Sequence, residues 1–177
     1  LIPKIELADA FLSKLLFRNW ESRYHSYMEQ SALACAETFA ARYDCDAGHY
    51  NLVREHCVKL FDRLKRLHGF TDHHRVILQV AAILHDSGYF VNAKGGCSTE
   101  LIRDLDICGL TGEDMKLAAV IANFTELWEP NFDGIGFLTF TEEEVLICSK
   151  LTAIFRLANS LDKSKKHKLK EISVKLR

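Results

Sequence analysis

Apolar residues recur along most of the chain at the three- and four-residue spacing of an amphipathic α-helix. The clearest run covers residues 52–67 and stops before Gly69, a residue suited to the left-handed conformation that ends many helices. Similar runs cover residues 7–16, 32–43 and 76–84. Only two prolines interrupt the sequence, and strand-like alternation is nearly absent. The pattern therefore predicts an all-α fold.

Two threonines mark helix starts. Thr111 with Asp114 and Thr141 with Glu144 fit the pattern in which side chains satisfy the free amide donors of a first turn. The second pair opens a long helix, for which we expect a buried face of Val145, Leu146, Ser149, Thr152, Ile154, Phe155, Ala158 and Leu161. Together these signals predict roughly seven helices.

Two segments depart from the helical pattern. Residues 129–140 contain glycine, asparagine and aromatic residues, which is typical of a connecting loop. Residues 171–177 alternate between apolar and polar positions, which predicts a strand. Because a lone strand cannot satisfy its own backbone, we expect its partners to come from beyond the C-terminus or from another chain. The chain also begins with Leu1, so we expect it to be a fragment of a longer protein.

Composition excludes several classes of protein. The 177 residues suit one domain with a small appendage. A formal net charge of -1 argues against general attraction to nucleic acid or anionic membranes. No apolar stretch approaches the roughly 20 residues that cross a bilayer. The six cysteines form no CxxC pair, so we expect reduced thiols in a cytoplasmic protein: Cys35, Cys45, Cys57, Cys97, Cys108 and Cys148.

The sharpest chemical signal is His85-Asp86, which ends an apolar helical run and precedes Ser87-Gly88. Adjacent helical side chains point about 100° apart, so the two converge on one ion only where the helix ends or lies close to the ion. His49 lies one predicted helix upstream, and another predicted helix ends near Asn159 and Asp162. The alternative interpretation is a buried, hydrogen-bonded pair in which Asp86 caps a helix or holds the imidazole tautomer.

Several segments, in order, resemble the C-terminal domain of the Ppx/GppA family of exopolyphosphatases and guanosine pentaphosphatases. They are Arg42 to His49, Cys57 to Leu64, Leu67 to Phe70, Ala81 to Tyr89, Ser98 to Ile102, Phe155 to Ser164 and Lys168 to Leu176. Residues 2–16 are similar to the family's joint between its phosphatase domain and its helical domain. The resemblance spans nearly the whole chain.

The resemblance implies an HD-domain-like helical bundle at residues 21–165. A linker helix at residues 1–20 would precede it, and a strand-containing subdomain would start at residues 166–177. Hydrolysis would belong to an N-terminal, actin-like phosphatase domain that is absent here, so no catalytic residue is expected in this chain. Preference for polyphosphate or guanosine pentaphosphate would lie largely in that other domain.

The leading hypothesis is therefore a non-catalytic accessory domain that binds polyphosphate and supports homodimerisation. Lysines crowd the C-terminal end of the sequence, where they form either a solvated tail or a contact for a polyanion. The candidate binding residues are Lys94, Arg103, Arg156, Lys163, Lys165, Lys166 and Lys168. A purely structural domain that dimerises through Trp20, Trp128 and Phe132 is a further alternative.

The competing hypothesis is a metal-dependent HD-type phosphohydrolase that acts on a nucleotide such as a guanosine polyphosphate. Its Mg²⁺ or Mn²⁺ ion would be bound by His49, His85 and Asp86. The fourth ligand position of the HD pattern falls on Asn159, whose neutral amide is a poor partner for a hard cation. We therefore expect any metal to be weakly bound or absent, and no cofactor in this domain.

Overall fold

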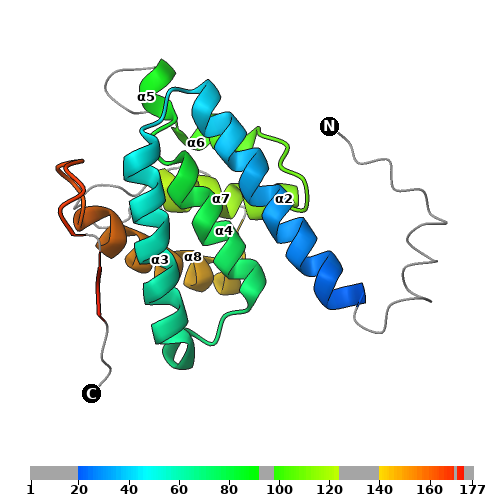
Figure 1. Cartoon of the computed structure of the whole chain (residues 1–177). Coiled ribbons are helices and arrows are strands. Elements are labelled where there is room, and N and C mark those ends of the chain that lie inside the picture. The colour runs from blue at the N-terminus through cyan, green and yellow to red at the C-terminus, as the bar shows by residue number, and fades with distance from the viewer. Residues whose placement is uncertain (1–19, 92–97, 124–139, 170, 174–177) are drawn as a thin grey trace.

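The computed structural model describes residues 20–91, 98–123, 140–169 and 171–173 (Figure 1). These residues form seven helices and no strand, so the all-α prediction is confirmed. The helices are α2 (Trp20–Arg42), α3 (Ala47–His68), α4 (Asp72–Leu84), α5 (Gly88–Val91), α6 (Ser98–Arg103), α7 (Gly112–Asn123) and α8 (Glu142–Ser160). None of them is long and apolar enough to span a bilayer.

Three predicted elements lie wholly or largely outside the described residues. The helix predicted at residues 7–16 is one of them, and the loop predicted at residues 129–140 is described only at Phe140. Of the strand predicted at residues 171–177, only residues 171–173 are described, and they are not in a strand.

Helix α4 is the centre of the bundle. All nine residues from Val76 to Leu84 are buried, as expected for a helix that other helices surround. Helices α2, α3 and α7 pack on α4, and α8 packs across α3 and α7. Figure 1 shows α4 between α2 and α3, with α7 behind it. The apolar run that ends at His85 therefore delivers this residue to the middle of the fold.

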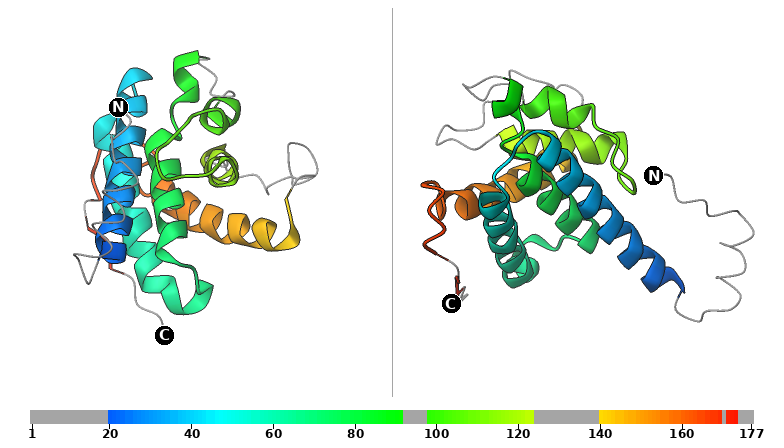
Figure 2. Two further views of the ribbon diagram at one scale, coloured as in Figure 1. Left: turned by 90° about the vertical axis from the view of Figure 1, so that its right-hand side faces the viewer. Right: turned by 45° about the horizontal axis from the view of Figure 1, so that its top comes forward.

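Helix α2 approaches α4 through small residues. Ala32, Ala36 and Ala40 repeat every four residues and are fully buried, so the two backbones can lie close together. The helix begins at Trp20, well before the predicted start at residue 32. Its first turns extend past the rest of the bundle (Figure 2) and leave Tyr24 and Tyr27 exposed. Residues 24–27 are all exposed, so this part of the helix carries no amphipathic pattern.

The predicted helix ends are confirmed. Gly69 follows α3 with φ 70°, in the left-handed region. Thr141 and Glu144 form a reciprocal capping box at the start of α8, and Thr111 and Asp114 make the equivalent contacts before α7. The predicted buried face of α8 is wrong at Leu146, which is 53% exposed, because the buried stripe instead runs through Cys148, Leu151, Thr152, Phe155 and Ala158.

Candidate functional site

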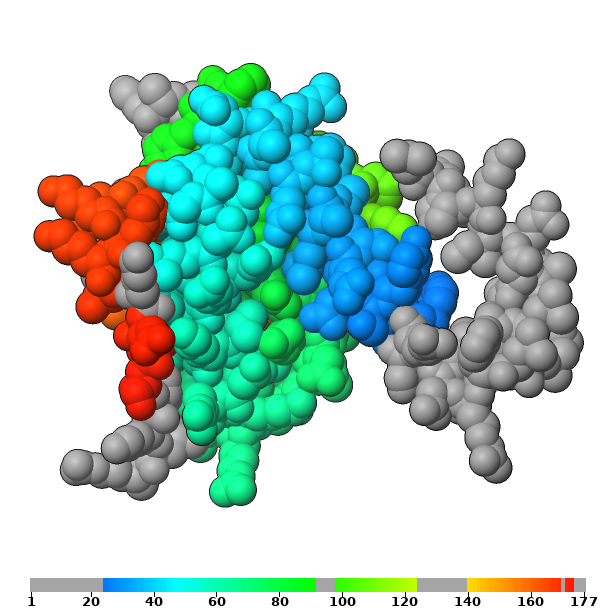
Figure 3. All heavy atoms as spheres, in the orientation of Figure 1, coloured from blue at the N-terminus to red at the C-terminus, as the bar shows by residue number. Residues whose placement is uncertain are grey.

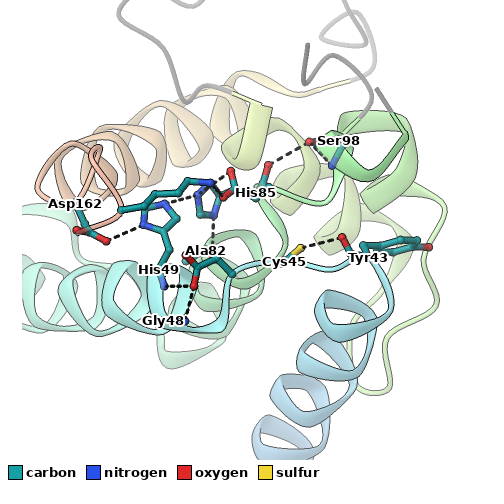
Figure 4. A network of polar contacts seen from close by, with 12 residues as sticks. Tyr43, Cys45, Gly48, His49, Ala82, His85, Ser98 and Asp162 are labelled. Atoms are coloured by element: carbon teal, nitrogen blue, oxygen red, sulfur yellow. Dashed lines mark hydrogen bonds and ion pairs between the residues drawn. The ribbon is translucent and has the colours of Figure 1, made fainter. Parts of the chain in front are cut away.

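His49 is held at the first turn of α3. Asp46 caps this helix, and its Oδ1 accepts hydrogen bonds from the backbone N–H groups of Gly48 (2.9 Å) and His49 (3.2 Å). The cap fixes the backbone from which the His49 side chain projects inward, where it is 1% exposed. Figure 4 shows its ring between the end of α4 and Asp162.

The turn after α4 places His85 opposite His49. Ser98, the first residue of α6, donates through Oγ to the His85 carbonyl (3.1 Å) and accepts from the Gly88 N–H (3.0 Å). A Cβ atom on Gly88 would lie 2.3 Å from Ser98 Oγ, so this turn requires glycine. Gly88 permits a helix to end near His85, and the structure shows that α4 ends at Leu84 and that Ser98 of α6 holds the turn that follows.

The two histidine rings face each other through their Nε2 atoms, 3.2 Å apart. His85 Nδ1 lies 2.8 Å from the Ala82 carbonyl, and His49 Nδ1 lies 2.9 Å from Asp162 Oδ2. Both partners only accept, so both Nδ1 atoms must carry hydrogen. Two neutral rings would then oppose lone pairs at Nε2. A cation bound between the two Nε2 atoms would relieve this repulsion.

Asp86 completes the cluster and is neutralised by a lysine from the far end of the chain. Its Oδ1 lies 3.4 Å from His85 Nε2, and its Oδ2 lies 2.5 Å from Lys165 Nζ. Burial raises the pKa of Asp86, but His85 and Lys165 outweigh burial and bring it below the usual value. Burial lowers the pKa of His85. The ammonium group of Lys165 also lies 5.6 Å from the centre of the Tyr89 ring.

Asp162 supports His49 from the segment that follows α8. Its Oδ2 accepts from His49 Nδ1 and from His167 Nδ1 (3.0 Å), and its Oδ1 accepts from the His167 N–H (2.8 Å). Burial raises the pKa of this carboxyl, yet these hydrogen bonds lower it overall. Because α8 ends at Ser160, Asp162 is not bound by helical spacing and can turn toward α3.

The donor set fits a small divalent ion. One ligand atom each from His49, His85 and Asp86 lies within 4.8 Å of the others. Nitrogen ligands about 2.1 Å from a metal, at angles of roughly 90–109°, are separated by about 3.0–3.4 Å, which matches the observed Nε2–Nε2 distance of 3.2 Å. Lys165 would compete with such an ion, because its ammonium group already contacts Asp86.

Four of the candidate polyphosphate-binding residues lie together. Lys163, Lys165, Lys166 and Lys168 are exposed on the six-residue stretch that follows Asp162. Arg103 is on α6 and pairs with Asp104 (2.9 Å), and Arg156 is half-buried on α8. Lys94 lies outside the described residues. The four C-terminal lysines are thus exposed on one short stretch of chain, which we call the lysine array.

The family model for Ppx/GppA phosphatase, domain III, matches residues 33–177. The chain belongs to the Ppx/GppA phosphatase family. Comparison with curated proteins gives no match. Membership confirms the family resemblance found in the sequence.

The Ppx/GppA domain has an open pocket of about 280 Å³ beside the cluster. Its lining is Tyr43, Asp44, Cys45, Asp46, Asp86, Tyr89, Phe90 and Lys165. Burial raises the pKa of the Cys45 thiol to about 11, with a further contribution from Asp86. The thiol is therefore protonated near neutral pH and is unsuited to act as a nucleophile.

Sequence reasoning missed two contacts in this Ppx/GppA domain. Asp162 was noticed only as a neighbour of Asn159, and Lys165 only as one of several charges. Their partners are 113 and 79 residues away, respectively. No local spacing relates such distant positions, so the only available signal was that each residue lies near the end of a predicted helix.

Proposed function

We propose that this chain is a non-catalytic accessory domain that binds inorganic polyphosphate through the lysines at residues 163–168. The observation that carries the proposal is the composition of this short exposed stretch. It contains Lys163, Lys165, Lys166 and Lys168 and no carboxylate of its own. The adjacent Asp162 is 2% exposed and already accepts hydrogen bonds from two histidines.

The lysines are not equivalent. Lys165 is held by Asp86, so its charge is largely compensated. Lys163, Lys166 and Lys168 make no ion pair with any residue that the structure describes. Lysine offers a point charge without a fixed hydrogen-bond geometry, which suits a flexible chain that carries about one charge per phosphate. Binding should be dominated by counterion release and weaken steeply with salt.

The test is binding of fluorescently labelled long-chain polyphosphate to the full 177-residue chain over a series of KCl concentrations. We expect anisotropy to show salt-sensitive binding. Replacing Lys163, Lys166 and Lys168 by glutamine should weaken binding. It should also reduce the slope of log K against log salt by about 2, at about 0.7 per lost contact.

The matched control replaces Arg42, Arg63 and Arg66 by glutamine, because these residues are also exposed and lie on other elements. It changes the net charge equally and should leave most of the affinity intact. Equal loss in both triple variants would show that only overall charge matters. Absence of salt-sensitive binding by the unmodified chain would reject the proposal.

Support for a homodimer is a second part of the proposed role. Tyr24 and Tyr27 are exposed on the first turns of α2, beyond the main bundle. Exposed aromatic side chains are enriched where proteins associate. Sedimentation of the chain and of a Tyr24→Ser, Tyr27→Ser variant over a range of concentrations should give a dimer and a weakened dimer, respectively. A monomer at every concentration rejects this part.

The second candidate function is metal-dependent phosphohydrolysis of a nucleotide such as a guanosine polyphosphate. It is favoured by the convergence of His49, His85 and Asp86, with two Nε2 atoms aimed at one point. When bound, a divalent ion would polarise a phosphoryl oxygen or activate water. His49 and His85 would hold it, while Asp162 and the Ala82 carbonyl orient the two rings.

Metal content separates the two candidates. Protein purified without chelator is analysed for bound metal and titrated with Mn²⁺, and hydrolysis of guanosine pentaphosphate is assayed with the ion present. The accessory-domain proposal expects weak Mn²⁺ binding and no hydrolysis. It also expects tighter binding in Lys165→Met, because this variant frees Asp86 of its ammonium partner. Tight binding together with turnover that His49→Gln abolishes would favour the enzyme.

A further inference from the structure

The segment that follows α8 lies along the outer side of α3. We call residues 162–169 and 171–173 the C-terminal segment. Figures 1 and 3 show it beside α3, and Asp162 ties its start to His49 on that helix. The His167 ring covers Gly48, where an added Cβ would lie 2.8 Å from His167 Nε2. Further along, Ile172 packs against the core.

His56 is buried on the side of α3 that the C-terminal segment follows. It comes seven residues after His49, which places the two side chains within about 20° of each other around the helix. The His56 ring is 0% exposed, and neither Nδ1 nor Nε2 has a hydrogen-bond partner. Protonation of an imidazole in this position is unfavourable, because burial keeps the added charge away from solvent.

The groups around His56 come from α3 and from the C-terminal segment. Burial lowers the pKa of His56 first of all, and Lys59 lowers it further. The nearby Leu169 main chain, Glu55 and Asp162 act in the opposite direction but do not prevail. The Leu169 contact shows that the segment reaches the His56 ring. Movement of the segment is therefore a direct route by which this ring can meet water.

The C-terminal segment is held in a strained conformation. Lys165 and His167 both have φ 51°, in the left-handed region that few residues other than glycine adopt. Lys163, Lys165, Lys166, Lys168 and Leu169 are all exposed. The segment is thus held by the contacts of Asp162, His167 and Ile172, by the Lys165–Asp86 ion pair and by little other burial, which is typical of parts that open locally.

We propose that the C-terminal segment is a strap that leaves α3 in mild acid, with His56 as the group whose protonation releases it. With the strap closed, the proton has no favourable place on the ring; with the strap open, the imidazolium is hydrated. Between the ordinary histidine pKa and the lowered pKa of His56, each unit by which pH falls shifts the equilibrium toward the open form about tenfold. The proposal does not depend on polyanion binding.

The pH range in which the strap is released is set by His56 rather than by the hydrogen bonds that Asp162 accepts. A histidine whose pKa is lowered in the closed form loses stability as pH falls below about 6.5, the value of the hydrated ring. The pKa of Asp162 is also lowered, so this carboxylate stays ionised until much lower pH. Release near pH 5–6 therefore cannot come from the protonation of Asp162.

The test is hydrogen–deuterium exchange of the full chain at about pH 7.5 and about pH 5.5, corrected for the intrinsic pH dependence of exchange. We expect peptides from residues 162–173 to lose protection in acid, because the hydrated ring binds a proton that the buried ring disfavours. Peptides from the buried part of α4 should keep theirs. His56→Leu and His56→Gln remove the titration and should keep the strap protected at both pH values.

His74→Leu is the matched control, because burial also lowers the pKa of His74, which lies on α4. This variant should release the strap as the unmodified chain does. NMR of the unmodified chain needs no variant, and the His56 ring should titrate with the same midpoint as the loss of protection. Protection that does not change with pH overturns the proposal. So does acid release that persists in both His56 variants.

Discussion

At the scale of single residues, one carboxylate organises the polar centre of the domain. Asp162 contacts His49 from α3 and both the main chain and the side chain of His167. It thereby sets the orientation of His49 and closes the turn that carries the lysine array. A buried acid with this many donors is stable only as the anion.

Asp162→Asn should destabilise the fold by about 1–3 kcal/mol at neutral pH, because the charge-assisted contacts to two histidines are weakened. The pKa of Asp162 is lowered in the native state. Its stabilising effect is therefore present above the unfolded value of about 3.9 and is lost as pH falls through the native value. Urea unfolding over a pH series should show a steeper acid loss for the unmodified protein than for the variant.

Asp104→Asn is the control for that measurement. The pKa of Asp104 is also lowered, by its hydrogen bond with Arg103. This pair lies on the surface, where such contacts contribute little to stability. Its removal should leave the unfolding midpoint nearly unchanged. If both variants behaved alike, the buried position of Asp162 would be irrelevant to its effect.

At the scale of the elements, residues at the helix ends fix where the helices begin and end. Asp46, Thr111 and Thr141 satisfy free amide groups at three helix starts. Gly69 ends α3 in the left-handed region. These devices act locally and require no contact from the rest of the fold. They therefore decide where His49 sits on its helix before any packing is considered.

Gly69→Ala should cost about 1 kcal/mol, because alanine resists a φ of 70°. A Cβ at this position meets no atom within 4 Å, so the backbone alone is tested. Gly112 also has open space around it but no positive φ. Gly112→Ala should be neutral or stabilising by up to about 1 kcal/mol. The midpoint temperatures of thermal unfolding should therefore fall for Gly69→Ala and stay the same or rise for Gly112→Ala.

At the scale of the whole molecule, the hydrophobic core and the polar cluster are continuous. Phe155 on α8 is fully buried, and its ring meets the His85 ring edge-on with 5.4 Å between centres. Helix α4 carries His85 at its end and is buried on all sides from Val76 to Leu84. Packing of α8 against α3 and α4 therefore fixes the position of the site.

Phe155→Ala should destabilise the domain by about 3–5 kcal/mol, because it removes a large side chain from a closed core. It should also broaden the NMR signals of the His85 ring. Leu146→Ala on the same helix is the control, since this side chain is 53% exposed, and its effect should stay within about 0.5 kcal/mol. A small effect at Phe155 would contradict the continuity of core and site.

Much of the fold was predictable from local patterns. Cap residues at Thr111 and Thr141 and the stop at Gly69 were identified because their chemistry involves only neighbours within a few residues. The first turns of α2 were not, because a helix without a buried face has no apolar period. Leu146 was misplaced because a helix with apolar residues on several sides leaves its buried face undetermined until its neighbours are known.

By itself, the sequence determined the all-α class, the helix ends, and the residue types His49, His85 and Asp86 that the site uses. Periodicity and capping act over a few residues, so they can be read without a fold. Only the tertiary structure decided which partner each polar group meets. The pairs Asp86–Lys165 and His49–Asp162 join positions 79 and 113 residues apart. Such pairs form because the helices pack around α4, and no local preference along the chain encodes them.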